Sequence, residues 1–422
     1  SAIINAFRVP DLRKKILFTL AIIALYRLGS FVPVPGIPAG ALTEAFKATA
    51  DNTAMVFLNL FSGNALAQFS VFSLGIMPYI TASIIMQLMQ GVIPSLQRWA
   101  REGQSGQKKI TQITRYVTLG LGLINAIGYL LLFQSPQYGV VLTTDLPSLF
   151  TSVVIVFTLV AGVAFIMWMG ELITQRGIGN GMSLIIFANI VAGFPGAIFE
   201  SVRTQSAAFT VLIIIVVLLV IPGIVLIERA QRRIPINYAK RIQGRRVMGG
   251  TSTYIPLKVN GAGVIPIIFA SALLYFPAQL AAFFNVPWLT SLSNLLASGS
   301  WVNWVLNFGL IVFFCFFYTS MVFNPDDTAD NLRKQGGFIP GVRPGVNTVQ
   351  YIKNVLNRIT LPGGIYIAMI AVVPSILFSM TGDSLISAFG GTSILIMVGV
   401  ALDTMSKLES QLKMHHYEGF FK

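Results

Sequence analysis

Leu58-Asn-Leu-Phe-Ser-Gly-Asn-Ala-Leu-Ala-Gln-Phe-Ser70 mixes apolar and polar side chains and runs directly into residues 71–93, which are 23 consecutive positions without a charge. As a helix, the first stretch would be about 20 Å long, too short for a hydrocarbon core of about 30 Å. It is also too polar to face lipid. This order predicts a segment that dips into the membrane inside a protein-lined cavity, because irregular backbone is tolerated at that depth only there. An amphipathic helix on the surface of an external loop is the alternative.

Composition places the chain among membrane proteins. Of its 422 residues, 55% are hydrophobic and 10% are charged, and the mean hydropathy is +0.74, whereas soluble proteins carry roughly 25% charged residues. Cys315 is the single cysteine, so no disulfide framework exists. Both histidines lie in the tail, which excludes a buried histidine-based site. The basic N-terminal arm precedes a long apolar run without a small-residue cleavage pattern, which indicates a retained anchor.

Hydropathy predicts an all-α polytopic membrane protein with ten transmembrane helices. The predicted spans cover residues 16–32, 71–93, 116–133, 150–169, 182–199, 209–227, 263–284, 304–323, 361–380 and 391–402. Ten spans divide into two five-helix halves, 1–204 and 205–422, and because five is odd the halves would be inverted. Inverted halves place a functional path at the membrane midplane between them. No sequence similarity between the halves is visible, so the repeat is inferred from the span count alone.

The positive charges distinguish the two sides of the membrane. On the predicted topology, 26 of the 29 Lys and Arg residues fall in the arm, the loops and the tail on one side. Only Arg27, Lys47 and Arg203 fall on the other side. The positive-inside rule makes the basic side cytosolic, so both termini are predicted to lie in the cytosol.

Two of the predicted cytosolic loops are long and basic. Residues 228–260 contain eight Lys or Arg and alternating, strand-like stretches, which predict an extended hairpin. Residues 324–360 contain five, around a centre rich in glycine and proline. These charges either serve orientation and contact with anionic lipid, or they dock a partner rich in phosphate or carboxylate groups.

Asp326-Asp-Thr-Ala-Asp330 matches the DDxxD pattern with which prenyl-transferring enzymes hold magnesium diphosphate. However, Asn324 and Pro325 precede it and basic residues follow it, which is ordinary chemistry for the two ends of a short helix. Such an enzyme also needs a second acidic cluster, and the sequence contains none. We therefore interpret the motif as a helix start and predict no enzymatic activity, cofactor or metal site.

The predicted spans almost lack charged residues, since Arg27, Glu171 and Asp403 lie at span ends. Ion-coupled transporters generally place an ionisable residue near the midplane, so a small-solute transporter is the weaker alternative. Instead, four spans place isoleucines beside small and polar residues, at 79–85, 183–187, 266–271 and 393–396. A narrow apolar ring built from them would block ions by dewetting while yielding to a passing chain. Taken singly, each run is also typical of a packed or lipid-facing helix.

Five motifs resemble the SecY/Sec61-alpha family of protein-translocation channels, and the resemblance runs nearly from end to end. They are Gly75-Ile-Met-Pro-Tyr-Ile80, Gly177-Ile-Gly-Asn-Gly181, Tyr254-Ile-Pro-Leu-Lys-Val-Asn260 with Gly263-Val-Ile-Pro266, Gly337-Phe-Ile-Pro-Gly341 with Arg343-Pro344, and Tyr417-Glu-Gly-Phe420. The resemblance implies a bacterial channel that passes unfolded secretory proteins and releases membrane segments sideways into lipid. The second and third spans against the seventh and eighth would form the lateral gate.

The resemblance also implies roles for individual residues. The pore ring would comprise Ile80, Ile84, Met182, Ile186, Ile265, Ile268 and Ile396, with Met182 where the family often has isoleucine. A plug helix over 58–70 would include Leu58, Asn59, Phe61, Ser62, Gly63, Asn64, Leu66 and Phe69. Docking of a motor or ribosome would involve Arg241, Arg245, Arg246, Arg333, Lys334 and Arg343, near Gly249-Gly250, which replaces bulkier residues of the family.

The same resemblance implies the partners and the location. The partners would be the SecE and SecG subunits, the SecA ATPase, the ribosome, signal sequences and nascent polypeptides, with SecDF and YidC as further contacts. The location would be the phospholipid bilayer of the bacterial inner (plasma) membrane, which the chain would cross several times.

Overall fold

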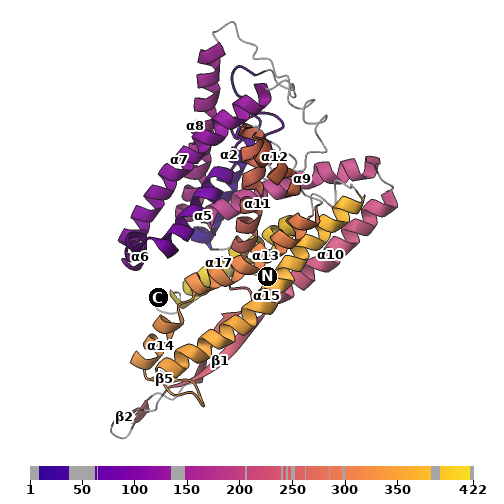
Figure 1. Ribbon diagram of the computed structural model, residues 1–422. Helices are drawn as coiled ribbons and strands as arrows, with labels where there is room; N and C mark the ends of the chain where they lie inside the picture. Colours follow the sequence, from indigo (N-terminus) through magenta and orange to yellow (C-terminus); the bar gives the residue numbers. More distant parts are fainter. Residues whose placement is uncertain are drawn as a thin grey trace.

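A computed structural model describes residues 9–37, 62–63, 65–134, 148–204, 207–238, 241–243, 246–248, 252–261, 263–284, 286–296, 300–381 and 390–418. This part of the chain is mostly helical (Figure 1). Its helices are α2 (Pro10–Gly29), α5 (Met77–Val92), α6 (Pro94–Arg101), α7 (Gln104–Gln134), α8 (Ser148–Arg176), α9 (Gly181–Thr204), α10 (Ala207–Arg229), α11 (Ile265–Phe284), α12 (Pro287–Leu295), α13 (Trp301–Val322), α14 (Pro325–Lys334), α15 (Val346–Thr381) and α17 (Gly391–Glu418).

Each of the ten predicted spans overlaps a helix, but not all of these helices have the length and composition of a membrane span. Within the described residues, five helices meet both criteria, or up to six if the bent pair α5 and α6 counts as one. Helix α2 does not qualify, because Arg13, Lys14, Lys15 and Arg27 all lie among its 20 residues. The protein therefore has several candidate membrane spans, and the crossing of all ten stays a prediction.

The segment 58–93 differs from the prediction. Residues 58–61 and 64 lie outside the described residues, and residues 62–63 and 65–69 form consecutive turns rather than a helix. The predicted start of the next span at 71 is also wrong, since α5 begins only at Met77. The Ser73 hydroxyl donates to the carbonyl oxygens of Ala65 and Ser70, and such local bonds compete with a helix. At its other end α5 stops at Val92, and the chain bends by 103° into α6.

Two groups of helices meet along α11 and α17 (Figure 1). Helices α5 and α8 pack on α7 in the first group, and α13 packs on α15 in the second. Helix α11 contacts α5 and α7 as well as α13, and α17 contacts α9, α10 and α15. The largest apolar cluster lies where these helices meet. We call it the junction cluster; its buried members include Ile80, Ile84, Met182, Ile186, Ile190, Ile267, Ile268, Leu395 and Ile396.

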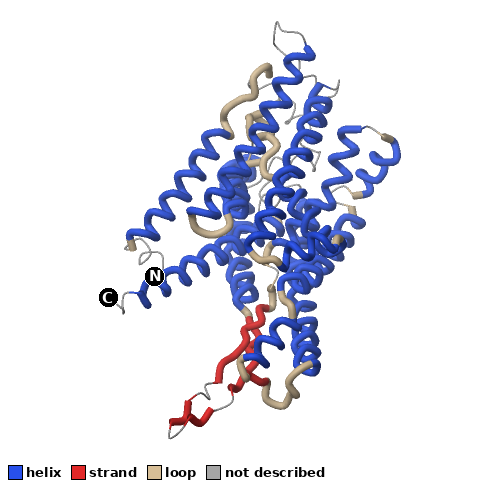
Figure 2. Tube along the Cα trace, turned by 90° about the vertical axis from the view of Figure 1, so that its left-hand side faces the viewer, coloured by secondary structure: helices blue, strands red, loops and turns tan. Residues whose placement is uncertain are grey.

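The predicted hairpin is confirmed, and it gains a strand from the other basic loop. Strand β1 (Gln231–Tyr238) pairs antiparallel with β4 (Ser252–Lys258) on one edge and with β5 (Gly337–Phe338) on the other. At the hairpin tip, β2 (Arg241–Gln243) pairs with β3 (Arg246–Met248), and the strands extend away from the helices (Figure 2). An apolar cluster joins the three-stranded sheet to α15 through Ile234, Leu257, Ile339, Ile352 and Leu356. The two basic loops thus form one folded unit, which we call the sheet unit (β1–β5, α14 and the start of α15).

The helix-start interpretation of the DDxxD motif is confirmed. Asn324 Oδ1 accepts from the backbone N–H of Asp326 (3.1 Å), and Asn324 Nδ2 donates to Asp327 Oδ2 (2.8 Å). Asn324 is therefore the N-cap of α14, whose last turn carries Arg333 and Lys334. Among the residues that the structure describes, no group of three or more His, Cys, Asp or Glu side chains could hold a metal ion.

Candidate functional site

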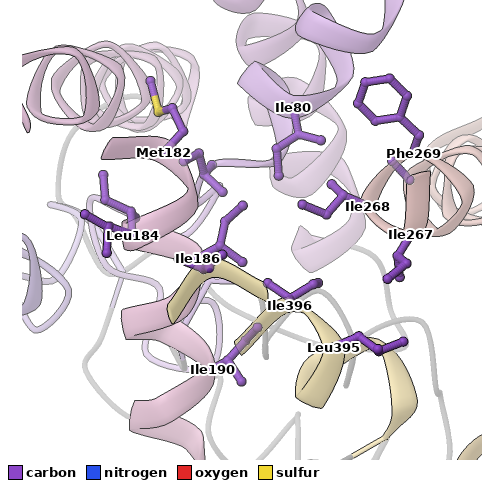
Figure 3. Packing of buried hydrophobic residues seen from close by; sticks show 14 of the residues in the cluster. Ile80, Met182, Leu184, Ile186, Ile190, Ile267, Ile268, Phe269, Leu395 and Ile396 are labelled. Atoms are coloured by element: carbon purple, nitrogen blue, oxygen red, sulfur yellow. The ribbon is translucent and has the colours of Figure 1, made fainter. Parts of the chain in front are cut away.

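Four helices bring the predicted ring residues into the junction cluster. The ring residues are Ile80 and Ile84 of α5, Met182 and Ile186 of α9, Ile265 and Ile268 of α11, and Ile396 of α17. All are buried except Ile265, which is half-buried. In Figure 3, the side chains of Ile80, Ile186, Ile268 and Ile396 point toward one another from the four helices. Residues far apart in the sequence therefore meet at one apolar point.

Met182 is oriented differently from these isoleucines. Its sulfur occupies the space that a Cβ on Gly170 of α8 would need, and in Figure 3 the sulfur is directed away from Ile268. The prediction also missed Ile190, which is fully buried in the same cluster. The sequence did contain a signal for it, because Ile190 follows Ile186 by four residues and so lies on the same helix face.

A glycine-rich turn positions the start of α9, which carries Met182 and Ile186. Gly179 has a φ of 84°, a conformation that glycine adopts without steric cost. A Cβ at Gly181 would overlap the carbonyl group of Gly170, so α9 approaches α8 closely only because residue 181 has no side chain. Asn180 Oδ1 accepts from the backbone N–H of Met182 (3.1 Å), which satisfies one of the free donors at the helix start.

The described part of the predicted plug is buried between helices. Leu66 and Phe69 are 0% and 2% exposed and pack with side chains of α7 and α8, whereas Ala65 belongs to the junction cluster. Ser62 Oγ accepts from the backbone N–H of Leu66 (3.1 Å). The other predicted plug residues, Leu58, Asn59, Phe61 and Asn64, lie outside the described residues.

Backbone hydrogen bonds tie the end of this segment to the chain that follows α2. The N–H of Val34 donates to the carbonyl of Phe69 (3.0 Å), and the N–H of Val71 donates to the carbonyl of Val32 (2.9 Å). These two bonds pair residues 69–71 with residues 32–34.

A polar contact that the sequence did not predict holds the segment at Gly63. Arg27 Nη1 donates to the carbonyl oxygen of Gly63 (3.1 Å) and to Asn189 Oδ1 (3.4 Å). Asn189 Nδ2 in turn donates to the hydroxyl of Tyr26 (2.9 Å). In the sequence, Arg27 stands out as one of only three positive charges on the predicted non-cytosolic side of the membrane. Nothing in the sequence marks Asn189.

The predicted docking residues that the structure describes all belong to the sheet unit. Arg333 and Lys334 are exposed at the end of α14, and Arg343 is exposed in the loop before α15. Arg343 lines an open groove of about 480 Å³ together with Asn347, Gln350, Tyr351 and Asn354. Arg241 lies in β2 and Arg246 in β3, at the outer end of the hairpin, and Arg245 lies outside the described residues.

This arrangement is suited to passage rather than to bond chemistry. The side chains that converge in Figure 3 are hydrocarbons, which offer hydrated ions no substitute for their water shell. They also place no fixed charge in the way of a polypeptide. An exposed basic surface lies apart from this apolar point, on the sheet unit.

Comparisons with known proteins identify relatives along the whole chain. The family model named SecY matches residues 70–405. The chain is 48% identical to the protein translocase subunit SecY of Streptomyces scabiei and 46% identical to that of Mycobacterium tuberculosis, with 100% of this chain and of each relative covered.

Two solved structures share the fold at much lower identity. One is described as "the structure of a protein conducting channel", with a TM-score of 0.65 at 16% identity over 94% of this chain and 92% of that chain. The other is Sec61 in the canine ribosome-channel complex, with a TM-score of 0.61 at 15% identity over 94% and 92%. These similarities support the helical arrangement described above.

Proposed function

The chain belongs to the SecY family of protein translocase subunits, and from this premise we propose that the isoleucines of α5, α9, α11 and α17 form the constriction through which it conducts polypeptide. As a member of that family it is a channel subunit of the Sec translocon and not an enzyme. The two relatives named above are bacterial, and the chain has several candidate membrane spans. We assign it to the inner (plasma) membrane with both termini in the cytosol, on the distribution of positive charge.

The pore ring of this proposal consists of Ile80, Ile84, Ile186, Ile265, Ile268 and Ile396, with Met182 behind it against α8. The observation that carries the proposal is the convergence of four of these side chains from four helices (Figure 3). A conduit for unfolded chains gains from a charge-free constriction, because each substrate carries different charges. Hydrocarbon side chains exclude hydrated ions and adapt to whatever residue passes.

We assign the plug to residues 58–70. Support comes from its described part, since Leu66 and Phe69 pack into the wall formed by α7 and α8 while Ala65 reaches the junction cluster. A segment that lies between the wall and the constriction obstructs the path.

Residues 1–204 and 205–422 are the two halves of the proposed channel, and the lateral gate lies between α5 and α7 on one side and α11 and α13 on the other. Support comes from α11, which contacts both α5 and α7 across the halves. A hydrophobic segment that replaced these contacts would reach lipid without crossing the rest of the bundle. Separation of the same helices would also widen the ring, because Ile80 and Ile268 lie on opposite sides of the gate.

The proposed partners divide by chemistry. The sheet unit would bind SecA or the ribosome through Arg241, Arg245, Arg246, Arg333, Lys334 and Arg343, because these side chains match phosphates and carboxylates. Signal sequences and nascent chains would bind along the gate. SecE and SecG would cover apolar helix faces within the membrane, and SecDF and YidC would be transient neighbours.

Site-specific crosslinking tests the ring. Cys315 is the only cysteine and is buried, so in a Cys315→Ser background single cysteines at 80, 186, 268 and 396 can be offered to a stalled substrate that carries a thiol-reactive probe. Ile224 of α10, which is 0% exposed, gives the matched control position. We expect crosslinks at the four ring positions and none at 224. Equal crosslinking at 224, or none at the ring while the substrate is trapped, would show that the path lies elsewhere.

A further inference from the structure

Arg27 is a half-buried charged side chain that donates hydrogen bonds to neutral groups. Its Nη1 donates to the Gly63 carbonyl oxygen and to Asn189 Oδ1. Among the described residues three ion pairs occur, and none of them includes Arg27. Because a half-buried guanidinium needs hydrogen-bond acceptors in place of the water that it loses, its position beside a backbone carbonyl points to a function for that contact.

Two adjacent residues of α2 hold both ends of one side-chain amide of α9. Asn189 Nδ2 donates to the Tyr26 hydroxyl, and Asn189 Oδ1 accepts from Arg27. Tyr26 and Asn189 are both 0% exposed. The amide is thereby fixed with its oxygen toward the guanidinium, and it orients Arg27 toward Gly63.

Gly63 is the residue type that this contact requires. Its φ is 65°, which side chains with a Cβ rarely adopt. A Cβ there would overlap Arg27 Nη1 and Asn189 Oδ1. The backbone of the segment can therefore lie directly against the guanidinium only because position 63 has no side chain.

We propose that Arg27 and Asn189 form a latch that holds the backbone of the plug at Gly63 in the closed channel, and that opening exchanges the Gly63 carbonyl for water. The latch deepens the plug function proposed above and rests on it. Neutral acceptors suit a contact that has to release, because they lack the second charge and the two parallel hydrogen bonds that a carboxylate offers a guanidinium. After release Arg27 keeps its bond to Asn189, so the charge is not left without an acceptor.

The latch predicts that two substitutions of Asn189 change the strength of the contact between Arg27 and Gly63 in opposite directions. Asn189→Leu removes the acceptor that orients Arg27, so the contact with Gly63 weakens. Asn189→Asp supplies a carboxylate that orients Arg27 more firmly, while the Tyr26 hydroxyl turns from acceptor to donor. If Asn189 only filled space in the bundle, both substitutions would loosen the segment.

Hydrogen exchange on the complete translocation complex in lipid vesicles measures the latch directly. With Arg27→Met, we expect the amides of residues 65–70 to exchange about ten-fold faster, the effect of losing one hydrogen bond to a charged group. With Asn189→Asp, we expect them to exchange more slowly than in the unaltered protein. Gly63→Ala displaces the Gly63 carbonyl from Arg27 without a substitution in α2 or α9. It therefore gives a second way to loosen the segment.

Arg203 gives the matched control. It is another of the three positive charges on the predicted non-cytosolic side, and its exposed side chain lies over the ring of Phe199 at 5.5 Å. Arg203→Met removes the same charge without touching the segment, so exchange at residues 65–70 should not change.

The possible outcomes distinguish a failure of the proposed latch from a failure of the proposed plug function. Unchanged exchange in both Arg27→Met and Gly63→Ala overturns the latch, as does faster exchange in Asn189→Asp. Single-channel conductance of the same variants tests the plug itself: loosened variants should show added resting openings. Faster exchange without added openings supports the latch as a physical contact and overturns the sealing role of the segment.

Discussion

Arg115 of α7 and Glu171 of α8 form a two-pronged ion pair, in which Nε lies 2.7 Å from Oε1 and Nη2 lies 2.6 Å from Oε2. The Glu171 side chain is only 18% exposed, so solvent screens the pair less than it screens a surface pair. The two helices that it joins also enclose Leu66 and Phe69. The ion pair therefore joins the two helices that flank Leu66 and Phe69.

Replacing Arg115 tests this ion pair. Arg115→Met leaves the Glu171 carboxylate without its partner and should lower the stability of the complex by about 1 to 3 kcal/mol, seen as a lower unfolding temperature in detergent. The exposed pair of Lys109 and Glu102, whose side chains are 55% and 43% exposed, gives the control. Glu102→Gln should change stability by less than about 1 kcal/mol. Equal losses in the two variants would contradict a special role for the α7–α8 pair.

Two neighbouring isoleucines of α11 test the ring. Ile268 points toward Ile80 and Ile396, whereas Ile267 points away from them (Figure 3). Ile268→Asn should raise the resting ion leak and the tolerance of weak signal sequences, because a polar side chain wets the constriction. Ile267→Asn buries the same amide at a position that is 1% exposed, so it reproduces any general loss of stability. The measurement is conductance across a bilayer, and equal leak in the two variants would mean that Ile268 does not line the path.

The sequence predicted the elements whose signals are local. Runs of apolar residues predicted the positions of ten helices, and alternation in residues 228–260 predicted the hairpin. Asn324 and Pro325 predicted the start of α14, because capping depends only on neighbours. Helix ends were predicted less well, as at Met77, since the turns before it depend on bonds to distant chain such as that between Val71 and Val32.

The site was predictable only in part, for the same reason. The motifs and their resemblance to a known family named the ring isoleucines, which the fold then brought together. Nothing local marks Asn189, because its role comes from Tyr26 and Arg27, more than 160 positions away. The pairing of β5 with β1 was likewise invisible, since β5 contributes only Gly337 and Phe338.

Gly337 tests whether the two basic loops work as one unit. A Cβ at Gly337 would lie 2.9 Å from Leu332 Cδ2, 3.0 Å from Tyr238 Cε1 and 3.2 Å from Ile236 Cγ2, so Gly337→Val should part β5 from β1. We expect faster hydrogen exchange at Asn237 and Tyr238, and binding of SecA or ribosomes weakened several-fold. At Gly261 a Cβ would meet only the Lys258 carbonyl oxygen at 3.9 Å, so Gly261→Val is the control. Binding that survives loss of the β1–β5 pairing would show that the loops dock independently.

Arg343 decides between the two interpretations of the basic loops, partner docking and contact with anionic lipid. Its exposed guanidinium lies beside a groove lined by amide side chains of α15, a surface that offers both charge and hydrogen bonds to a partner. Arg343→Glu should weaken binding of SecA or ribosomes about ten-fold or more and block export into vesicles, because the charge is reversed at a close contact. Lys413→Glu makes the same charge reversal at an exposed position of α17, outside the sheet unit. It should leave both partner binding and export unchanged. If Arg343→Glu instead reduces attachment to anionic vesicles while partner binding persists, the loops serve the lipid surface and the docking role is wrong.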